Sequence, residues 1–228
     1  MTASKQSDVV FTAVRDAILA CTLKPSQKLR IGDITAKYQV SPGAAREALS
    51  RLVSEGMVNA LPQRGFSVAP ISRKELADLT EARVLLECEC LRIAIEKGDI
   101  EWEAEIVSAH HRLGLVGEKT MAPMPHLNEA WSQAHSLFHT ALVASCDNEC
   151  LLDLREQLYA RSERYRHWSV SLSDVPLHNR NVRVEHAELM QAVLDRNTKL
   201  SCELAAAHFR KTSSELVRAS DLLNREIA

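Results

Sequence analysis

The chain has 228 residues, of which 46% are hydrophobic and 25% charged, the composition of a folded protein with a buried core. Its seven glycines and seven prolines exclude collagen-like and low-complexity structures. No apolar run approaches the roughly 20 residues that a membrane span needs. The first residues, MTASKQSDVV, lack the apolar core of a signal peptide. We therefore expect a cytoplasmic protein that makes no contact with a membrane.

Charge and glycine are unevenly distributed along the chain. Residues 1–72 hold nine basic and five acidic side chains, whereas the remainder holds 19 basic and 25 acidic ones. A basic head on an acidic body favours a module that binds a polyanion, joined to a second domain. All seven glycines lie before residue 118. The glycine-free remainder predicts helices, because a β-rich fold would need turn glycines there.

The head predicts three helices followed by a hairpin. The expected helices lie near 8–21, 31–38 and 42–55, and the expected strands near 57–61 and 66–69. Ser41 is a suitable N-cap for the third helix, Pro42 suits its first position, and Gly56 ends it. This order predicts a winged helix-turn-helix domain over residues 1–70, whose third helix enters the major groove of double-stranded DNA.

The candidate DNA-binding residues lie on the third helix, just before it, on the hairpin, and directly before the second helix. Arg46 and Arg51 can face DNA while Ala45 and Leu49 face the core, and Arg64 can reach a phosphate or the minor groove. Two arginines on one helix usually mark only a solvated surface, but the complete order of elements is more specific. The full set of candidates is Arg30, Ser41, Gly43, Arg46, Arg51, Arg64 and Gly65.

The segment from Val10 to Val68 resembles the N-terminal domain of GntR-family regulators, above all in REALSRLVSEGMV at 46–58 and RGFSV at 64–68. The resemblance implies a winged helix that binds an operator. The sequence departs from the family where Pro42-Gly43-Ala44 replaces the usual Arg-Thr-Pro, so an arginine that usually contacts DNA is missing. The departure bears on the operator sequence and not on the fold.

The body predicts an all-α bundle over residues 74–228, joined to the head by a linker at 69–73. Its expected helices lie near 73–97, 100–116, 127–145, 148–170, 178–196 and 198–224. The fold class is therefore mainly α. The six cysteines contain no C-x-x-C pair, and in a reducing cytoplasm we expect them to be small buried residues.

Four histidines lie on or beside the apolar stripes of three predicted helices: His135, His139, His186 and His208. Each one alone is most simply a hydrogen-bonded core residue. Four imidazoles converging in an apolar core are costly unless they share a partner, and a divalent cation is the natural partner. No H-E-x-x-H, G-x-S-x-G, P-loop or G-x-G-x-x-G motif is present, so we do not expect an enzyme.

The body resembles the FCD ligand-sensing domain of the FadR branch of GntR regulators, from about Lys74 to Arg218. The matching segments are EARVLLE at 81–87, LFH at 137–139, EH at 185–186 and AHF at 207–209. In that family an Asp and three His hold a metal, which implies His135, His139, His186 and His208, with His135 in place of the Asp. Four nitrogen ligands favour zinc, nickel or another transition metal over magnesium. The alternative is that His135 does not bind the metal.

The segments WSQAHSLFHTALVASC and ARSERYR are most similar to the carbon-starvation-induced regulator (CsiR) type. This resemblance implies a small carboxylate effector such as glutarate or 2-hydroxyglutarate. We expect Arg83, whose helix lines the pocket in the resembled family, to bind the carboxylate, with Arg164 and Arg166 as weaker candidates; the alternative is that Arg83 forms a surface salt bridge. We expect a homodimer on a near-palindromic operator, because one winged helix reads few bases and two half-sites restore specificity. We also expect the protein to act as a repressor and to associate with the nucleoid. The alternatives are an architectural DNA-binding protein without an effector and an all-α metalloenzyme with a DNA-binding head.

Overall fold

The computed structural model describes residues 3–20, 22–117, 128–172 and 180–226. Two compact units make up the chain. The first comprises Met1–Ser72 with Ala160–Trp168, and the second Arg73–Tyr159 with Ser169–Ala228.

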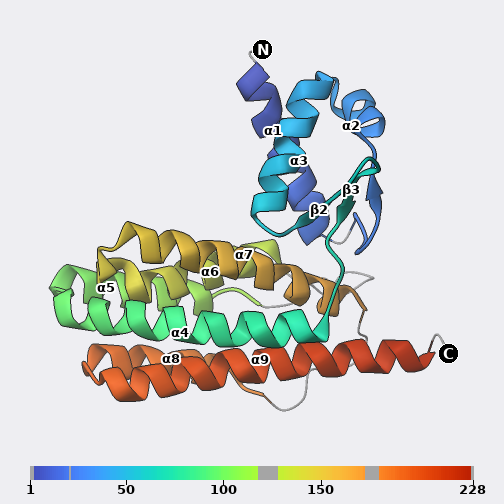
Figure 1. The fold of residues 1–228 in the computed structure, drawn as a ribbon. Helices are drawn as coiled ribbons and strands as arrows, with labels where there is room; N and C mark the ends of the chain where they lie inside the picture. The colour runs from blue at the N-terminus through green and yellow to red at the C-terminus, as the bar shows by residue number, and fades with distance from the viewer. Residues whose placement is uncertain (1–2, 21, 118–127, 173–179, 227–228) are drawn as a thin grey trace. The chain divides into compact units, whose positions relative to one another are not determined.

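The first unit contains the predicted three helices and hairpin, so the winged helix-turn-helix prediction is confirmed. Its elements are α1 (Ala3–Leu19), β1 (Lys28–Leu29), α2 (Ile31–Tyr38), α3 (Pro42–Ser54), β2 (Val58–Leu61) and β3 (Gly65–Val68) (Figure 1). The strands form an antiparallel sheet in the order β1-β3-β2. The sequence does not predict β1, because two residues are too few to show the alternation of a strand.

Helix α1 begins at Ala3, earlier than the predicted start near residue 8. Its first turns carry few apolar residues, so periodicity misses them. Ser7 is nevertheless fully buried, and the Gln6 side-chain oxygen accepts a hydrogen bond from the backbone N–H of Ser41 at 3.3 Å. The start of α1 is thus held by the residue that precedes α3.

Helix α3 buries one face in the core of the first unit. Ala45, Leu49 and Leu52 are all 0% exposed, as predicted, and pack with apolar residues of α1 such as Val14. Gly56 follows the helix with φ +68°, a backbone conformation that side chains with a Cβ rarely adopt. It therefore ends α3 as the sequence predicts.

A short part of helix α7 belongs to the first unit. Ala160 lies in its core, and the Arg164 guanidinium donates hydrogen bonds to the carbonyl oxygens of Ala69 and Pro70, both at 3.2 Å. The Tyr165 hydroxyl donates to the carbonyl oxygen of Ser72 at 3.3 Å. The units therefore differ from the predicted ranges 1–70 and 74–228, because residues distant in sequence hold the linker.

The second unit is helical, as predicted. Its elements are α4 (Arg73–Lys97), α5 (Ile100–Gly114), α6 (Glu129–Val143), the 3-10 helix η1 (Ala144–Cys146), α7 (Glu149–Leu172), α8 (Val182–Leu194) and α9 (Thr198–Glu226). Helix α4 packs lengthwise along α9, and α8 also packs against α9 (Figure 1). The predicted starts at 127 and 178 fall outside the described residues. No described helix is long and apolar enough to cross a membrane.

The second unit contains a buried ion pair between α4 and α7. Arg155, 6% exposed, donates from Nε and Nη2 to the two carboxylate oxygens of Glu87, at 2.7 and 3.1 Å. Its Nη2 also donates to the carbonyl oxygen of His139 at 2.8 Å. The pair therefore fixes the backbone of a histidine-bearing helix, α6, against α4 and α7.

The expectation that the cysteines are buried holds for only part of the set. Cys90 and Cys146 are buried, but Cys88 and Cys202 are half-buried and Cys150 is exposed. Cys21 lies outside the described residues. The prediction was wrong for Cys150 because it follows directly on the start of α7, where the helix faces solvent.

Candidate nucleic-acid interface and metal centre

The exposed side of α3 carries the first group of candidate DNA-binding residues. Ser41 is the N-cap of α3, and its hydroxyl oxygen accepts a hydrogen bond from the N–H of Ala44 at 3.2 Å. Gly43 and Arg46 are exposed, while Ala45 beside them is buried. A guanidinium on the free face of this helix is placed to donate to the edge of a base in the major groove.

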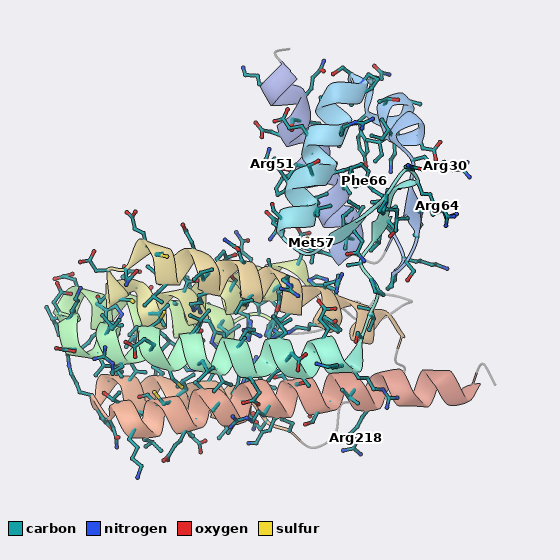
Figure 2. All side chains as sticks on the ribbon, in the orientation of Figure 1. Arg30, Arg51, Met57, Arg64, Phe66 and Arg218 are labelled. Carbon is teal, nitrogen blue, oxygen red and sulfur yellow. The ribbon has the colours of Figure 1, made fainter. Side chains whose placement is uncertain are left out.

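The wing carries the second group. Arg64 lies in the exposed turn between β2 and β3, next to Gly65, whose φ of +88° favours glycine. Arg30 is exposed at the start of α2. In Figure 2, Arg30 and Arg64 both lie on the wing side of the first unit, away from α1. Two cations at the wing suit contacts with phosphates.

Arg51 differs from the other arginines because it is held against α1. Its Nη1 donates to the Asp8 carboxylate at 2.7 Å, and its guanidinium lies 4.2 Å from the centre of the Phe11 ring. Figure 2 places it on the α1 side of α3. The sequence could not reveal this restraint, because Asp8 and Arg51 are far apart in the chain.

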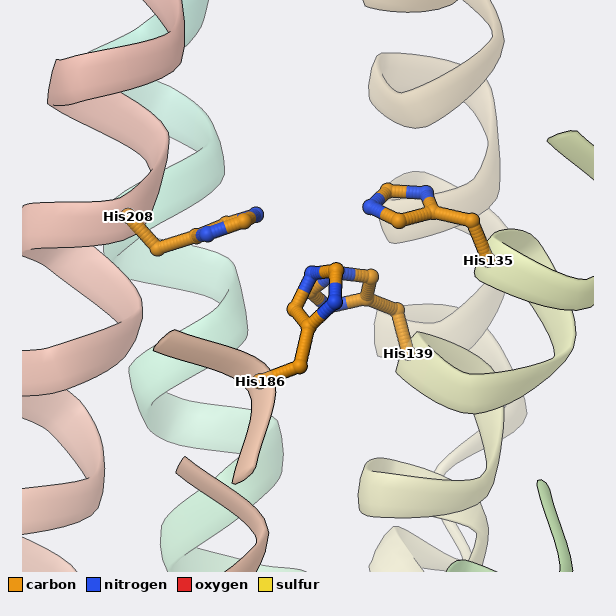
Figure 3. Close-up of side chains that lie close together, drawn as sticks. All are labelled: His135, His139, His186 and His208. Carbon is orange, nitrogen blue, oxygen red and sulfur yellow. The ribbon is translucent and has the colours of Figure 1, made fainter. Parts of the chain in front are cut away.

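Three helices of the second unit bring the four predicted histidines together. His135 and His139 come from α6, His186 from α8 and His208 from α9, and their exposed fractions are only 1–3%. One ring nitrogen from each lies within 4.8 Å of those from the other three. Figure 3 shows the four rings converging on a common space. The predicted grouping is thus present in the structure.

His139 is the least satisfied member of this cluster. Neither of its ring nitrogens has a hydrogen-bond partner among the described residues, although both are buried. Burial lowers the pKa of His139 well below its ordinary value, and the neighbouring His186 and His208 lower it further. A neutral imidazole with no partner is costly in a protein core but is the form that binds a metal.

His208 is oriented from outside the cluster by residues that the sequence analysis did not predict. Its Nδ1 lies 2.9 Å from the Glu185 carboxylate, and Arg180 donates to the same carboxylate at 2.6 Å and to the carbonyl oxygen of His208 at 3.1 Å. Burial alone would raise the pKa of Glu185, but hydrogen bonds with His208 and Arg180 hold it well below its ordinary value. Only the tertiary fold brings these residues to His208.

Nδ1 of His208 lies within hydrogen-bond distance of both the Glu185 carboxylate, at 2.9 Å, and Arg180 Nη2, at 3.1 Å, so Nε2 is the nitrogen turned toward the other three histidines. A carboxylate behind a histidine is the usual support of a metal ligand, because it fixes the ring and raises its basicity. Arg180 and Glu185 also line a shallow, open groove formed by residues of α8 and α9.

His135 is positioned by stacking. Its ring lies 4.6 Å from the Trp131 ring, with an angle of 21° between the planes. The two residues are four apart on α6, so this contact could have been predicted from helical spacing. His135 is 4.5 Å from His139 and 5.1 Å from His186, measured between ring centres.

The cluster fits a metal ion with nitrogen ligands. Two imidazoles bound at the usual zinc–nitrogen distance have nitrogens about 3.4 Å apart in a tetrahedron and about 4.2 Å apart when opposite. The four ring nitrogens lie within 4.8 Å of one another, which is about 1.4 Å wider than the tetrahedral spacing and about 0.6 Å wider than the opposite one. The rings would have to move inward to hold an ion, which would then pair with one of the two open nitrogens of His139.

The foremost of the predicted effector-binding arginines, Arg83, lies by the cluster. The Arg83 guanidinium lies 4.2 Å from the centre of the Phe209 ring, which is itself 5.9 Å from the His139 ring, and its charge contributes to lowering the pKa of His139. Arg164 instead contacts the linker carbonyls of the first unit. Its position does not support the prediction that it binds an effector.

Comparison with known proteins agrees with this two-part organisation. Residues 6–68 match the gntR family of bacterial regulatory proteins, and residues 78–211 match the FCD domain. The chain is 38% identical over 219 residues to the uncharacterized HTH-type transcriptional regulator BphR of Paraburkholderia xenovorans, covering 95% of this chain and 86% of that protein. It is 36% identical over 198 residues to the HTH-type transcriptional repressor GlaR of Escherichia coli, covering 86% and 88%.

The fold is also found in a solved structure. The Escherichia coli protein McbR/YncC superimposes with a TM-score of 0.75 at 21% identity, covering 93% of this chain and 97% of that one. At this identity the likeness concerns the fold alone.

Proposed function

Since the chain belongs to the GntR family of bacterial regulatory proteins and carries an FCD domain, we propose that it is a repressor that senses a small carboxylate through a bound divalent metal. Its relatives are named transcription regulators, so the chain is a DNA-binding regulator and not an enzyme. One of these relatives is named a repressor, which supports the proposed sign of regulation.

The observation that carries the metal proposal is the cluster of four buried imidazoles. His135, His139, His186 and His208 would hold the ion, and the lack of partners on the buried ring of His139 supports this, because one of its nitrogens would bind the ion. Nitrogen ligands favour zinc, with nickel or another transition metal as alternatives. When bound, the ion supplies a positive charge and coordination positions for an anion.

The effector proposal rests on the charge of the site. Four neutral histidines would leave both charges of the ion uncompensated at its ligands, and Arg83 adds a cation beside His139. This surplus favours an anion over a neutral metabolite. The resemblance of residues 131–146 and 160–166 to the CsiR type further supports a dicarboxylate such as glutarate or 2-hydroxyglutarate. Arg83 would bind a carboxylate that projects toward Phe209.

We further infer that the protein binds a near-palindromic operator as a homodimer. Arg46 would read a base edge, Arg30 and Arg64 would contact phosphates, and Ser41 would orient α3. A single winged helix gives too little specificity, and two half-sites restore it. The effector releases DNA only if it binds the DNA-incompetent arrangement more tightly than the competent one.

The experiment is an operator-binding titration on a DNA fragment selected from a random pool. Wild type, His139→Ala and the control His110→Ala are each measured with and without zinc, and with and without glutarate or 2-hydroxyglutarate. His110 is a half-buried histidine of α5 that lies outside the cluster. We expect the dicarboxylate to weaken operator binding only in zinc-loaded wild type and His110→Ala.

Two outcomes would contradict the proposal. An equal response in the metal-free protein would show that the effector does not need the ion. Operator binding that no dicarboxylate changes in the zinc-loaded protein would instead favour an architectural DNA-binding role.

A further inference from the structure

Two cysteines face each other where α4 packs against α9. The Cys88 thiol donates to the carbonyl oxygen of Cys202 at 3.7 Å, and the Cys202 thiol donates to the carbonyl oxygen of Cys88 at 3.6 Å. Each thiol is also the largest influence on the pKa of the other, so the two side chains lie close together. Each side chain therefore points from its own helix toward the other residue. A disulfide between α4 and α9 would need the same arrangement.

The other described cysteines lack either a partner thiol or access to solvent. Cys90 and Cys146 lie in the same apolar core, but both are 0% exposed. Cys150 is exposed on α7. Cys88 and Cys202 are half-buried, so a small oxidant in solution can reach them. Among the described residues, this pair alone combines contact between thiols with access.

The two thiols are chemically unequal. The contact with Cys88 lowers the pKa of Cys202, whereas the contact with Cys202, together with burial, raises the pKa of Cys88. The thiolate is the reactive form of cysteine, so Cys202 is the better nucleophile of the two. A neighbouring thiol within reach of a reactive thiolate is the arrangement of a resolving cysteine.

We propose that Cys88 and Cys202 are a peroxide-sensitive thiol pair that forms a reversible disulfide between α4 and α9. The Cys202 thiolate attacks one oxygen of hydrogen peroxide, the O–O bond breaks, and the hydroxide released takes a proton to leave as water. The Cys88 sulfur then attacks the resulting sulfenic acid, the S–O bond breaks, and a second water leaves with the Cys88 proton. Two thiols are oxidised by two electrons, and the peroxide is reduced to two waters.

The position of the pair gives the bond a structural consequence. Cys88 packs against a cluster formed by Val84, Ala206 and Phe209. Phe209 lies under Arg83 and follows His208, so a crosslink here would restrain the helix pair that borders the histidine cluster. The thiol chemistry itself does not depend on a bound metal.

The test uses the full-length protein exposed to hydrogen peroxide, then blocked with N-ethylmaleimide and digested without reduction for mass spectrometry. We expect a Cys88–Cys202 crosslinked peptide that is lighter by two hydrogen atoms than the two separate peptides and that dithiothreitol separates. Cys150→Ser is the matched control and should form the same crosslink. Cys90 and Cys146 should remain thiols, and Cys21 is followed as its own peptide.

The single variants identify the nucleophile. In Cys88→Ser, dimedone should trap a sulfenic acid on Cys202, whereas Cys202→Ser should give little trapped product on Cys88. The proposal is overturned if peroxide oxidises Cys150 in the wild type while Cys88 and Cys202 are still recovered as maleimide adducts. Accumulation of sulfinic acid on Cys202 without any crosslink would overturn it equally. Both readings come from the wild type and do not depend on the folding of a variant.

Discussion

In the first unit, the candidate DNA contacts Arg30, Arg46 and Arg64 are exposed, and each lies in a short continuous segment of the winged helix. In the second unit, the four histidines are buried and come from three separate helices. Exposed arginines can change without disturbing a core. A ligand bound at the buried cluster would contact side chains of α6, α8 and α9 at once. It could therefore favour one packing of these helices over another, as a sensor domain requires. The following predictions use this contrast.

The largest effect on stability is expected at the buried ion pair of the second unit. In Glu87→Gln, Arg155 stays buried with its charge uncompensated, which should lower the free energy of unfolding by about 3–5 kcal/mol. Urea denaturation followed by circular dichroism measures this change. Glu96→Gln, an exposed position on the same helix, is the control and should leave the midpoint unchanged. A similar loss in both variants would show that burial does not decide the effect.

The support behind His208 should control metal affinity. In Glu185→Gln the carboxylate that orients the ring is replaced by an amide, and zinc affinity should fall by about 10–100-fold, as is usual for such partners. Competition with a chromogenic chelator measures the affinity. Glu188→Gln, exposed on the same helix, should bind zinc like the wild type. Unchanged zinc affinity in Glu185→Gln would mean that His208 needs no support or does not bind the ion.

An exposed arginine of the first unit should affect DNA binding without affecting stability. Arg46→Ala should weaken operator binding by about 1–3 kcal/mol if the guanidinium pairs with a guanine edge. Fluorescence anisotropy at fixed salt measures the loss. The thermal midpoint should not move, because Arg46 is exposed beside a complete core. Operator affinity equal to that of the wild type would remove Arg46 from the set of DNA contacts.

Arg51 should show the smallest effect, because α1 already holds it. Its exposed ion pair with Asp8 should contribute less than about 1 kcal/mol to stability. We expect Arg51→Ala to weaken operator binding less than Arg46→Ala in the same anisotropy assay. Asp8→Asn separates the two roles, since it releases the guanidinium and should leave affinity unchanged or raise it. A larger loss at Arg51 than at Arg46 would reverse the assignment.

The sequence predicts the parts of this structure that depend on local patterns. Ser41, Pro42 and Gly56 mark the ends of α3 by their own chemistry, and helical spacing places His135 and His139 on one face of α6. The sequence does not predict the partners that only the tertiary fold supplies. Asp8 holds Arg51 across distant segments, and Arg164 turns out to bind the linker. No spacing rule connects such residues.

The histidine cluster lies between these two cases. Its members fall on apolar stripes that periodicity identifies, but their convergence depends on how three helices pack. In the sequence, Glu185 is notable only because it precedes His186. Its contact with His208 depends on the packing of α8 against α9, so the sequence does not predict it.

X-ray absorption spectroscopy of the purified, zinc-loaded protein tests the central claim most directly. With one zinc per chain, we expect an absorption edge and fine structure dominated by imidazole nitrogens at about 2.0–2.1 Å. In His139→Ala the imidazole signal and the stoichiometric zinc should both be lost, while His110→Ala keeps them. Zinc bound through sulfur, or retained in full by His139→Ala, would contradict a metal centre built from these four histidines.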